Sequence, residues 1–169
     1  MKLLQYGEIG LTYQLLVLLV QMVKPLQRNY LKHILSAKFD IHATEENFNT
    51  SISLPLTLLQ ITKYHGASII EMGANQPGDI QKLCNITKPT HGLITNIAPA
   101  HLEGFKNIET IASTKGALFK SLKDGISFVN EADKRVSRYL LRVKKLHMVL
   151  VQIVIIQLIF IMRTMERFH

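Results

Sequence analysis

The chain has 169 residues, a formal net charge of +8 and one cysteine. This length suits a single domain with a hydrophobic core. One cysteine excludes an internal disulfide and fits a reducing cytoplasm. The basic charge could indicate nucleic-acid binding, but it is scattered, and its densest run, residues 134–145, has little aromatic interleaving. A solvated helix face is therefore the preferred interpretation of that run.

The first 30 residues carry no motif for phosphate binding. The apolar stretch Leu15–Val20 has no small-residue cleavage site after it, so we predict no signal peptide. Residues Val17–Arg28 read VLLVQMVKPLQR and contain no glycine. A glycine-rich loop needs close backbone approach to phosphate, so this segment cannot form one, and Lys24 alone does not replace it.

Two short apolar runs predict neighbouring buried strands. Ser68–Met72 carries Glu71 near its end, and Gly92–Ile97 is followed by His101. The sequence between them predicts a helix, from a proline and an aspartate suited to a first turn and from apolar residues at helical spacing. These residues are Pro77, Asp79, Ile80, Leu83 and Ile86. A strand, helix, strand crossover makes the strands parallel, so Glu71 and His101 should lie at the sheet edge where ligands bind.

A second predicted helix carries a lysine within its apolar face. Apolar residues at three-and-four spacing surround Lys115; they are Ile108, Ile111, Ala112, Phe119 and Leu122. Burial would lower the proton affinity of this lysine and leave a reactive neutral amine. The alternative is a lysine at the edge of the stripe whose ammonium reaches water. We expect Cys84 to be a small buried hydrophobic residue, and the histidines other than His101 to be structural or surface residues.

Several blocks together resemble the central domain of the Mur ligase family. They are HATEENFNTSISLPLTLL (His42–Leu59), EMGANQPG (Glu71–Gly78), TNIAPAHLEGF (Thr95–Phe105) and STKGALF (Ser113–Phe119). The resemblance implies an α/β fold, a three-layer parallel sheet flanked by helices. It also implies an ATP- and magnesium-dependent amide ligase of peptidoglycan synthesis, of the branch that adds D-alanyl-D-alanine to UDP-N-acetylmuramoyl-tripeptide.

The resemblance also assigns roles to four residues. Glu71 and His101 match the ligands of a magnesium ion, and Asn96 would shape the same ATP-binding crevice. Lys115 matches the lysine that the family carbamylates, which makes it the candidate catalytic residue. Taken singly, the glutamate could be a solvated rim residue and the histidine a hydrogen-bonded structural one; their joint placement favours the metal.

The resemblance covers residues 31–145 and predicts three segments. Residues 1–30 replace the family's ATP loop, 31–145 form the central-domain fragment, and 146–169 form an altered apolar tail. Codons can be chosen for Val17–Tyr30 that, shifted by one base, encode SITGSNGKTTTKEL, the form of the missing loop, and the tail regroups similarly. Our hypothesis is a frameshift at both ends. Resequencing the gene tests it, and a frame in which these codons are absent would refute it.

The remaining expectations concern activity and partners. The family's UDP-sugar-binding and carboxyl-terminal domains have no counterpart in the sequence, and Thr50, Ser53 and Glu46 depart from the family pattern GNLNNHIGVP. We therefore predict no ligase activity for this chain, and a cytoplasmic monomer without nucleic-acid or membrane partners. The apolar run Val149–Met162 is shorter than the roughly 20 residues of a spanning helix. The alternative is a noncatalytic basic domain that associates with membrane or nucleic acid.

Overall fold

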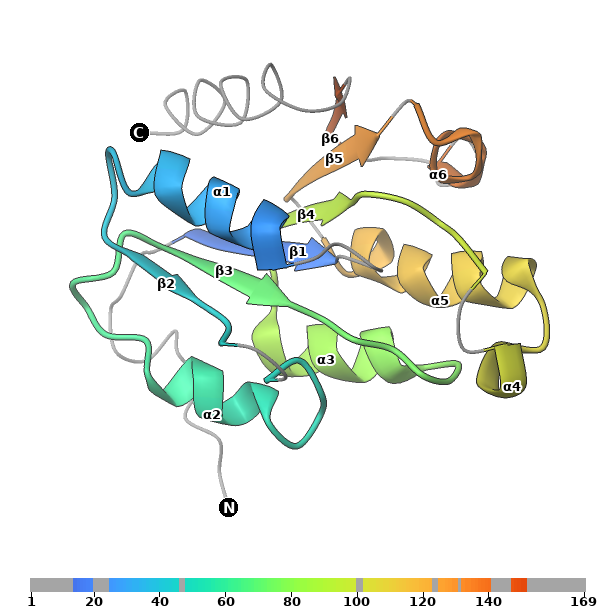
Figure 1. Cartoon of the computed structure of the whole chain (residues 1–169), viewed down its shortest axis with the longest axis horizontal. Coiled ribbons are helices and arrows are strands. Elements are labelled where there is room, and N and C mark those ends of the chain that lie inside the picture. The colour runs from blue at the N-terminus through green and yellow to red at the C-terminus, as the bar shows by residue number, and fades with distance from the viewer. Residues whose placement is uncertain are drawn as a thin grey trace.

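The computed structural model describes residues 14–19, 25–45, 48–99, 102–122, 125–130, 132–140 and 147–151 (Figure 1). The strands are β1 (Gln14–Leu19), β2 (Ile41–Ala43), β3 (Ala67–Glu71), β4 (His91–Ile94), β5 (Ile126–Asn130) and β6 (His147–Val151). The helices are α1 (Pro25–Leu35), α2 (Leu54–Leu59), α3 (Asp79–Thr87), α4 (Leu102–Phe105), α5 (Ile108–Ser121) and α6 (Lys134–Leu140).

The strands form one six-stranded sheet in the order β2-β3-β1-β4-β5-β6, and every pair is parallel. From β1 the chain crosses to β2 at one edge of the sheet and returns to β3 beside β1. It then passes to the other side of β1 and builds outward through β4, β5 and β6. The predicted crossover is therefore confirmed, although β1 lies between its two strands. The carboxyl end of β1, where the chain changes direction across the sheet, is where open parallel sheets bind ligands.

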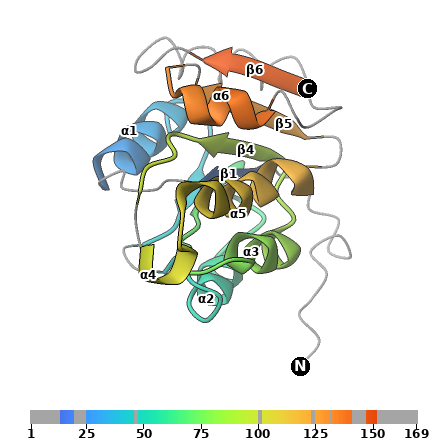
Figure 2. The same ribbon diagram turned by 90° about the vertical axis from the view of Figure 1, so that its right-hand side faces the viewer.

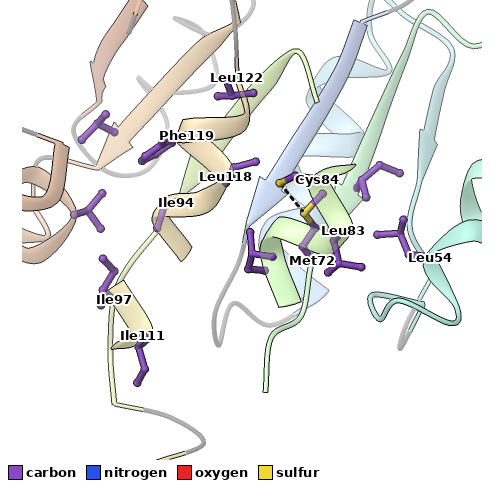
Figure 3. Close-up of a cluster of buried hydrophobic side chains, with 14 of the residues drawn as sticks. Leu54, Met72, Leu83, Cys84, Ile94, Ile97, Ile111, Leu118, Phe119 and Leu122 are labelled. Atoms are coloured by element: carbon purple, nitrogen blue, oxygen red, sulfur yellow. Dashed lines mark hydrogen bonds between the residues drawn. The ribbon is translucent and has the colours of Figure 1, made fainter. Parts of the chain in front are cut away.

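Helices cover both faces of the sheet, and each face has its own hydrophobic core (Figures 1 and 2). Because successive strand residues point to opposite faces, Ile69 packs with α1 in one core while Ile70 packs with α3 and α5 in the other. Figure 3 shows part of this second core, including Phe119 and Leu83. The three-layer α/β fold expected from the sequence is confirmed.

Two helices begin close to where the sequence predicts. In α5, Asn107 is the N-cap, and its side-chain oxygen accepts a hydrogen bond from the Thr110 amide at 2.8 Å. In α3, Pro77 lies before the helix rather than in its first turn, since Gly78 occupies the N-cap with a φ of 88°. The left-handed conformation of Gly78 redirects the chain there. The Asp79 carboxylate closes the preceding turn by accepting hydrogen bonds from the backbone amides of Asn75 and Gln76.

The segments predicted to be altered supply two strands. β1 falls within residues 1–30 and pairs with β3 and β4, and β6 opens the apolar tail and pairs with β5. Residues 20–24, part of the segment Val17–Arg28 where the ATP loop is expected, and residues 152–169 are outside the described part of the chain. Among the described residues, no helix is both long and apolar enough to cross a membrane.

Candidate functional site

The candidate site lies at the carboxyl end of β1, where two neighbouring strands end beside it. Leu18 of β1 is in register with Glu71, the last residue of β3, and Leu19 is in register with Ile94, the last residue of β4. The residues after Ile94, including Asn96, therefore emerge on the opposite side of β1 from Glu71. Glu71 thus lies at the carboxyl end of its strand, as the sequence predicts.

Glu71 is held by three neighbouring residues. Its backbone amide donates to the Thr44 hydroxyl at 3.0 Å, and its Oε1 accepts a hydrogen bond from Asn49 Nδ2 at 3.2 Å. Its Oε2 lies 3.7 Å from a guanidinium nitrogen of Arg28 on α1. The side chain of Glu71 is only 20% exposed, and that of Arg28 12%. Both carboxylate oxygens thus already have a donor or a cation beside them.

Lys115 lies in the middle of α5 and is buried, with 4% of its surface exposed. Its Nζ donates a hydrogen bond to the backbone carbonyl of Asn96 at 2.8 Å. Desolvation lowers the pKa of the Lys115 ammonium from 10.5 to about 7, and the charge of Asp133 opposes this shift. The prediction that Lys115 is buried is confirmed, and the alternative of a lysine reaching water is wrong. The reactivity of its amine stays a prediction.

A hydrogen-bond network fixes the backbone that faces Lys115. Asn130, at the end of β5, donates from Nδ2 to the Thr95 carbonyl at 2.6 Å. Asp133 accepts from the Ile97 amide at 2.9 Å. The backbone on both sides of Asn96 is therefore tied to the end of β5 and the turn that follows it. This holds the Asn96 carbonyl toward Lys115, while the Asn96 side chain accepts a bond from the Thr95 hydroxyl at 3.3 Å.

The second predicted magnesium ligand, His101, lies outside the described residues. Within the described part of the chain, no group of three or more histidine, cysteine, aspartate or glutamate side chains could hold a metal ion. Since Glu71 is also engaged by Arg28 and Asn49, the described residues do not form a preassembled magnesium site.

Four other residues behave as the sequence predicts. Cys84 is 2% exposed, and burial raises the pKa of its thiol to about 11; its Sγ contacts the sulfur of Met72 at 4.0 Å (Figure 3). Lys134 and Arg135 are exposed on α6, consistent with a solvated helix face. His91 is a buried structural residue, stacked at 6.2 Å on Phe128, and burial lowers its pKa.

Sequence reasoning missed three residues of this site. Arg28 lies in a segment that the sequence analysis described only by its lack of a glycine-rich loop. Asn49 received no role, although its neighbour Thr50 was noted as a departure from the family pattern. The sequence signal that could have found Arg28 is its spacing, since it lies three residues before Leu31 and seven before Leu35, both buried. Asp133 had no signal, because only the fold brings it to the backbone of Ile97.

The family model described as "Mur ligase middle domain" matches residues 21–155. The chain belongs to the Mur ligase family. Among curated relatives, the UDP-N-acetylmuramoyl-tripeptide–D-alanyl-D-alanine ligase of Haemophilus influenzae is 38% identical over 109 residues, which are 64% of this chain and 24% of the relative. The Escherichia coli ligase of that name is 40% identical over 88 residues, 52% of this chain and 20% of the relative. The chain thus spans about a quarter or less of these relatives.

Solved structures of Mur ligases agree with the fold. A MurF structure from Acinetobacter baumannii has a TM-score of 0.78 and 26% identity, and it covers 85% of this chain and 32% of its own. The MurF ligase of Thermotoga maritima, solved in complex with ADP, has a TM-score of 0.68 and 30% identity, and it covers 85% of this chain and 34% of its own. The Mur ligase fold expected from the sequence is therefore confirmed.

Proposed function

We propose that this chain is the central, ATP-binding part of an amide ligase that adds D-alanyl-D-alanine to UDP-N-acetylmuramoyl-tripeptide, and that the chain alone does not catalyse the reaction. The observation that carries the proposal is Lys115, buried and held at 2.8 Å from the Asn96 carbonyl beside the carboxyl end of β4. The curated relatives named as D-alanyl-D-alanine ligases support it, as does the similar MurF structure solved in complex with ADP. The cytoplasm is the proposed compartment, because the one cysteine fits a reducing environment.

Lys115 is proposed as the carbamylated residue. Because the pKa of its ammonium is about 7, about half of the side chain is the neutral amine at neutral pH. The amine nitrogen bonds to the carbon of carbon dioxide and releases a proton, which leaves a carbamate anion. A carbamate would place a negative charge next to the Asn96 segment, where a cation could neutralise it.

Glu71 and His101 are proposed as the magnesium ligands of the family reaction, in which a bound magnesium ion would neutralise phosphate charge. In this chain the fit is incomplete. The Glu71 carboxylate already faces Arg28, and the described residues contain no metal-binding cluster. Asn96 contributes its backbone to the same edge, and its carbonyl is occupied by Lys115.

The missing ATP loop gives the proposal a direct test. Calorimetry would compare binding of ATP and magnesium by this chain and by a version in which residues 17–30 read SITGSNGKTTTKEL. We expect only the restored version to bind, since its glycines allow the backbone amides to approach phosphate. Tight binding by the original chain would contradict the assigned role of the loop, and no binding by a folded restored version would contradict the nucleotide-binding proposal.

A further inference from the structure

Arg28 projects from the buried stripe of α1 toward the carboxyl end of the sheet. Leu31 and Leu35 anchor this helix in the core, with 3% and 0% of their surfaces exposed. Arg28 lies three and seven residues before them, so it shares their helix face one turn nearer the helix start. Its guanidinium reaches 3.7 Å from Glu71 Oε2, and its side chain is 12% exposed.

The two partners of Glu71 differ in what they do to its charge. Asn49 donates a neutral hydrogen bond to Oε1 and leaves the carboxylate negative. Arg28 brings a positive charge to Oε2, carried on a guanidinium that suits pairing with a carboxylate. A divalent cation approaching this carboxylate would therefore meet a fixed positive charge at the oxygen it needs.

We propose that Arg28 is an internal cation that occupies the electrostatic place of a metal ion at Glu71 and suppresses divalent-cation binding by this chain. The inference rests on the proposed function in that it takes Glu71 as the metal-facing carboxylate. It adds that the weakness of the site has a specific cause on α1, separate from the missing ATP loop. Removing the arginine should uncover a carboxylate that can take a hard divalent cation.

The test measures Mn²⁺ binding, which is detected as the loss of the electron paramagnetic resonance signal of the free ion. Unmodified protein would be compared with Arg28→Gln and with Arg28→Met, which fills similar space without charge, so that the result does not depend on one variant folding. Lys32→Gln is the matched control, because Lys32 is an exposed cation on the same helix. Circular dichroism would establish that each variant is folded.

We expect both Arg28 variants to bind Mn²⁺ at least about thirtyfold more tightly than the unmodified chain, the change that one unit charge about 4 Å from a divalent ion produces even at the dielectric constant of water. Lys32→Gln should change affinity far less, because the charge of an exposed side chain is screened by solvent and salt. The double variant Arg28→Gln with Glu71→Gln should lose the gain, which would assign the new site to Glu71.

The other outcomes overturn the inference in distinguishable ways. Equal affinity of the unmodified chain and the Arg28 variants, lost in Glu71→Gln, would show that Arg28 does not compete while leaving Glu71 as a metal ligand. A gain that survives the loss of Glu71 would place the ion elsewhere. No Mn²⁺ binding by any folded variant would reject both the inference and the metal role of Glu71, whereas ATP binding by the loop-restored chain would still support the nucleotide site.

Discussion

Replacing Lys115 with methionine should change how the stability of the domain depends on pH. The side chain is 4% exposed, and desolvation lowers the pKa of its ammonium to about 7, against 10.5 for the ordinary group. Between these values the unfolded chain carries a proton on this lysine that the folded chain does not. Unfolding therefore takes up a proton, and the free energy of unfolding rises as pH increases.

The size of the effect follows from the two pKa values. Between pH 7 and pH 9 one such group raises the free energy of unfolding by about 2 kcal/mol, since the limiting slope is about 1.4 kcal/mol per pH unit and is reached only above the folded pKa. Below pH 7 the folded protein bears the whole cost of burying the charge. Lys115→Met removes that cost but leaves the Asn96 carbonyl without its donor, an opposing loss of about 1–3 kcal/mol that does not vary with pH.

The assay is urea unfolding of both proteins at pH 7, 8 and 9, at constant ionic strength and in buffers free of carbon dioxide so that no carbamate forms. We expect the stability difference between Lys115→Met and the unmodified chain to shift by about 2 kcal/mol across this range, in favour of the unmodified chain at higher pH. Lys120→Met, at an exposed position of the same helix, should show no such shift. A constant difference for Lys115→Met would refute the claim that this lysine is buried at the cost of its charge.

Three further predictions concern packing and capping. Asn107→Ala should lower the free energy of unfolding by about 1 kcal/mol, because the Thr110 amide loses its cap, and Asn107→Asp should restore it; equal urea midpoints for all three would contradict the cap. Gly104→Ala should cost about 1–3 kcal/mol in the same assay, since a Cβ there would overlap the backbone carbonyl of Asn75, and an unchanged midpoint would disprove that close approach. Cys84, whose pKa burial raises to about 11, should react slowly with a disulfide reagent at pH 8 in the folded protein and readily in urea; fast reaction of the folded form would contradict its burial.

The sequence predicted those parts of the fold that depend on local pattern. The apolar run ending in Glu71 and the stripe around Lys115 have the period of the elements they form, and β3 and α5 appear close to where they were expected. Pro77 marks the limit of this reasoning. A proline fits a first helical turn, but the left-handed conformation of Gly78 moves the start of α3 beyond it, and a backbone angle is not visible in composition.

The candidate site was predictable only where a residue carried its own signal. Glu71 and Lys115 stood out because each is a charged residue in an apolar pattern. The structure places Glu71 at the expected edge of the sheet and brings the Lys115 ammonium to the carbonyl of Asn96. Asp133 stabilises the segment facing Lys115 from 36 residues away in sequence, through the Ile97 amide. Such a contact depends on how β4 and β5 pair, which no local pattern encodes.

Arg28 shows why a missing motif is a poor guide to what a segment does. The segment 17–28 lacks every glycine of a phosphate loop, which led to a prediction of lost function and to no prediction of structure. In the fold the same segment still supplies half of β1 and the first turn of α1. The end of α1 nearest the sheet edge then carries an arginine where a phosphate-binding chain would expose backbone amides, and that arginine meets Glu71. The absence of loop glycines and the presence of Arg28 are thus two features of one stretch of sequence, and binding measurements on separate variants can divide their effects.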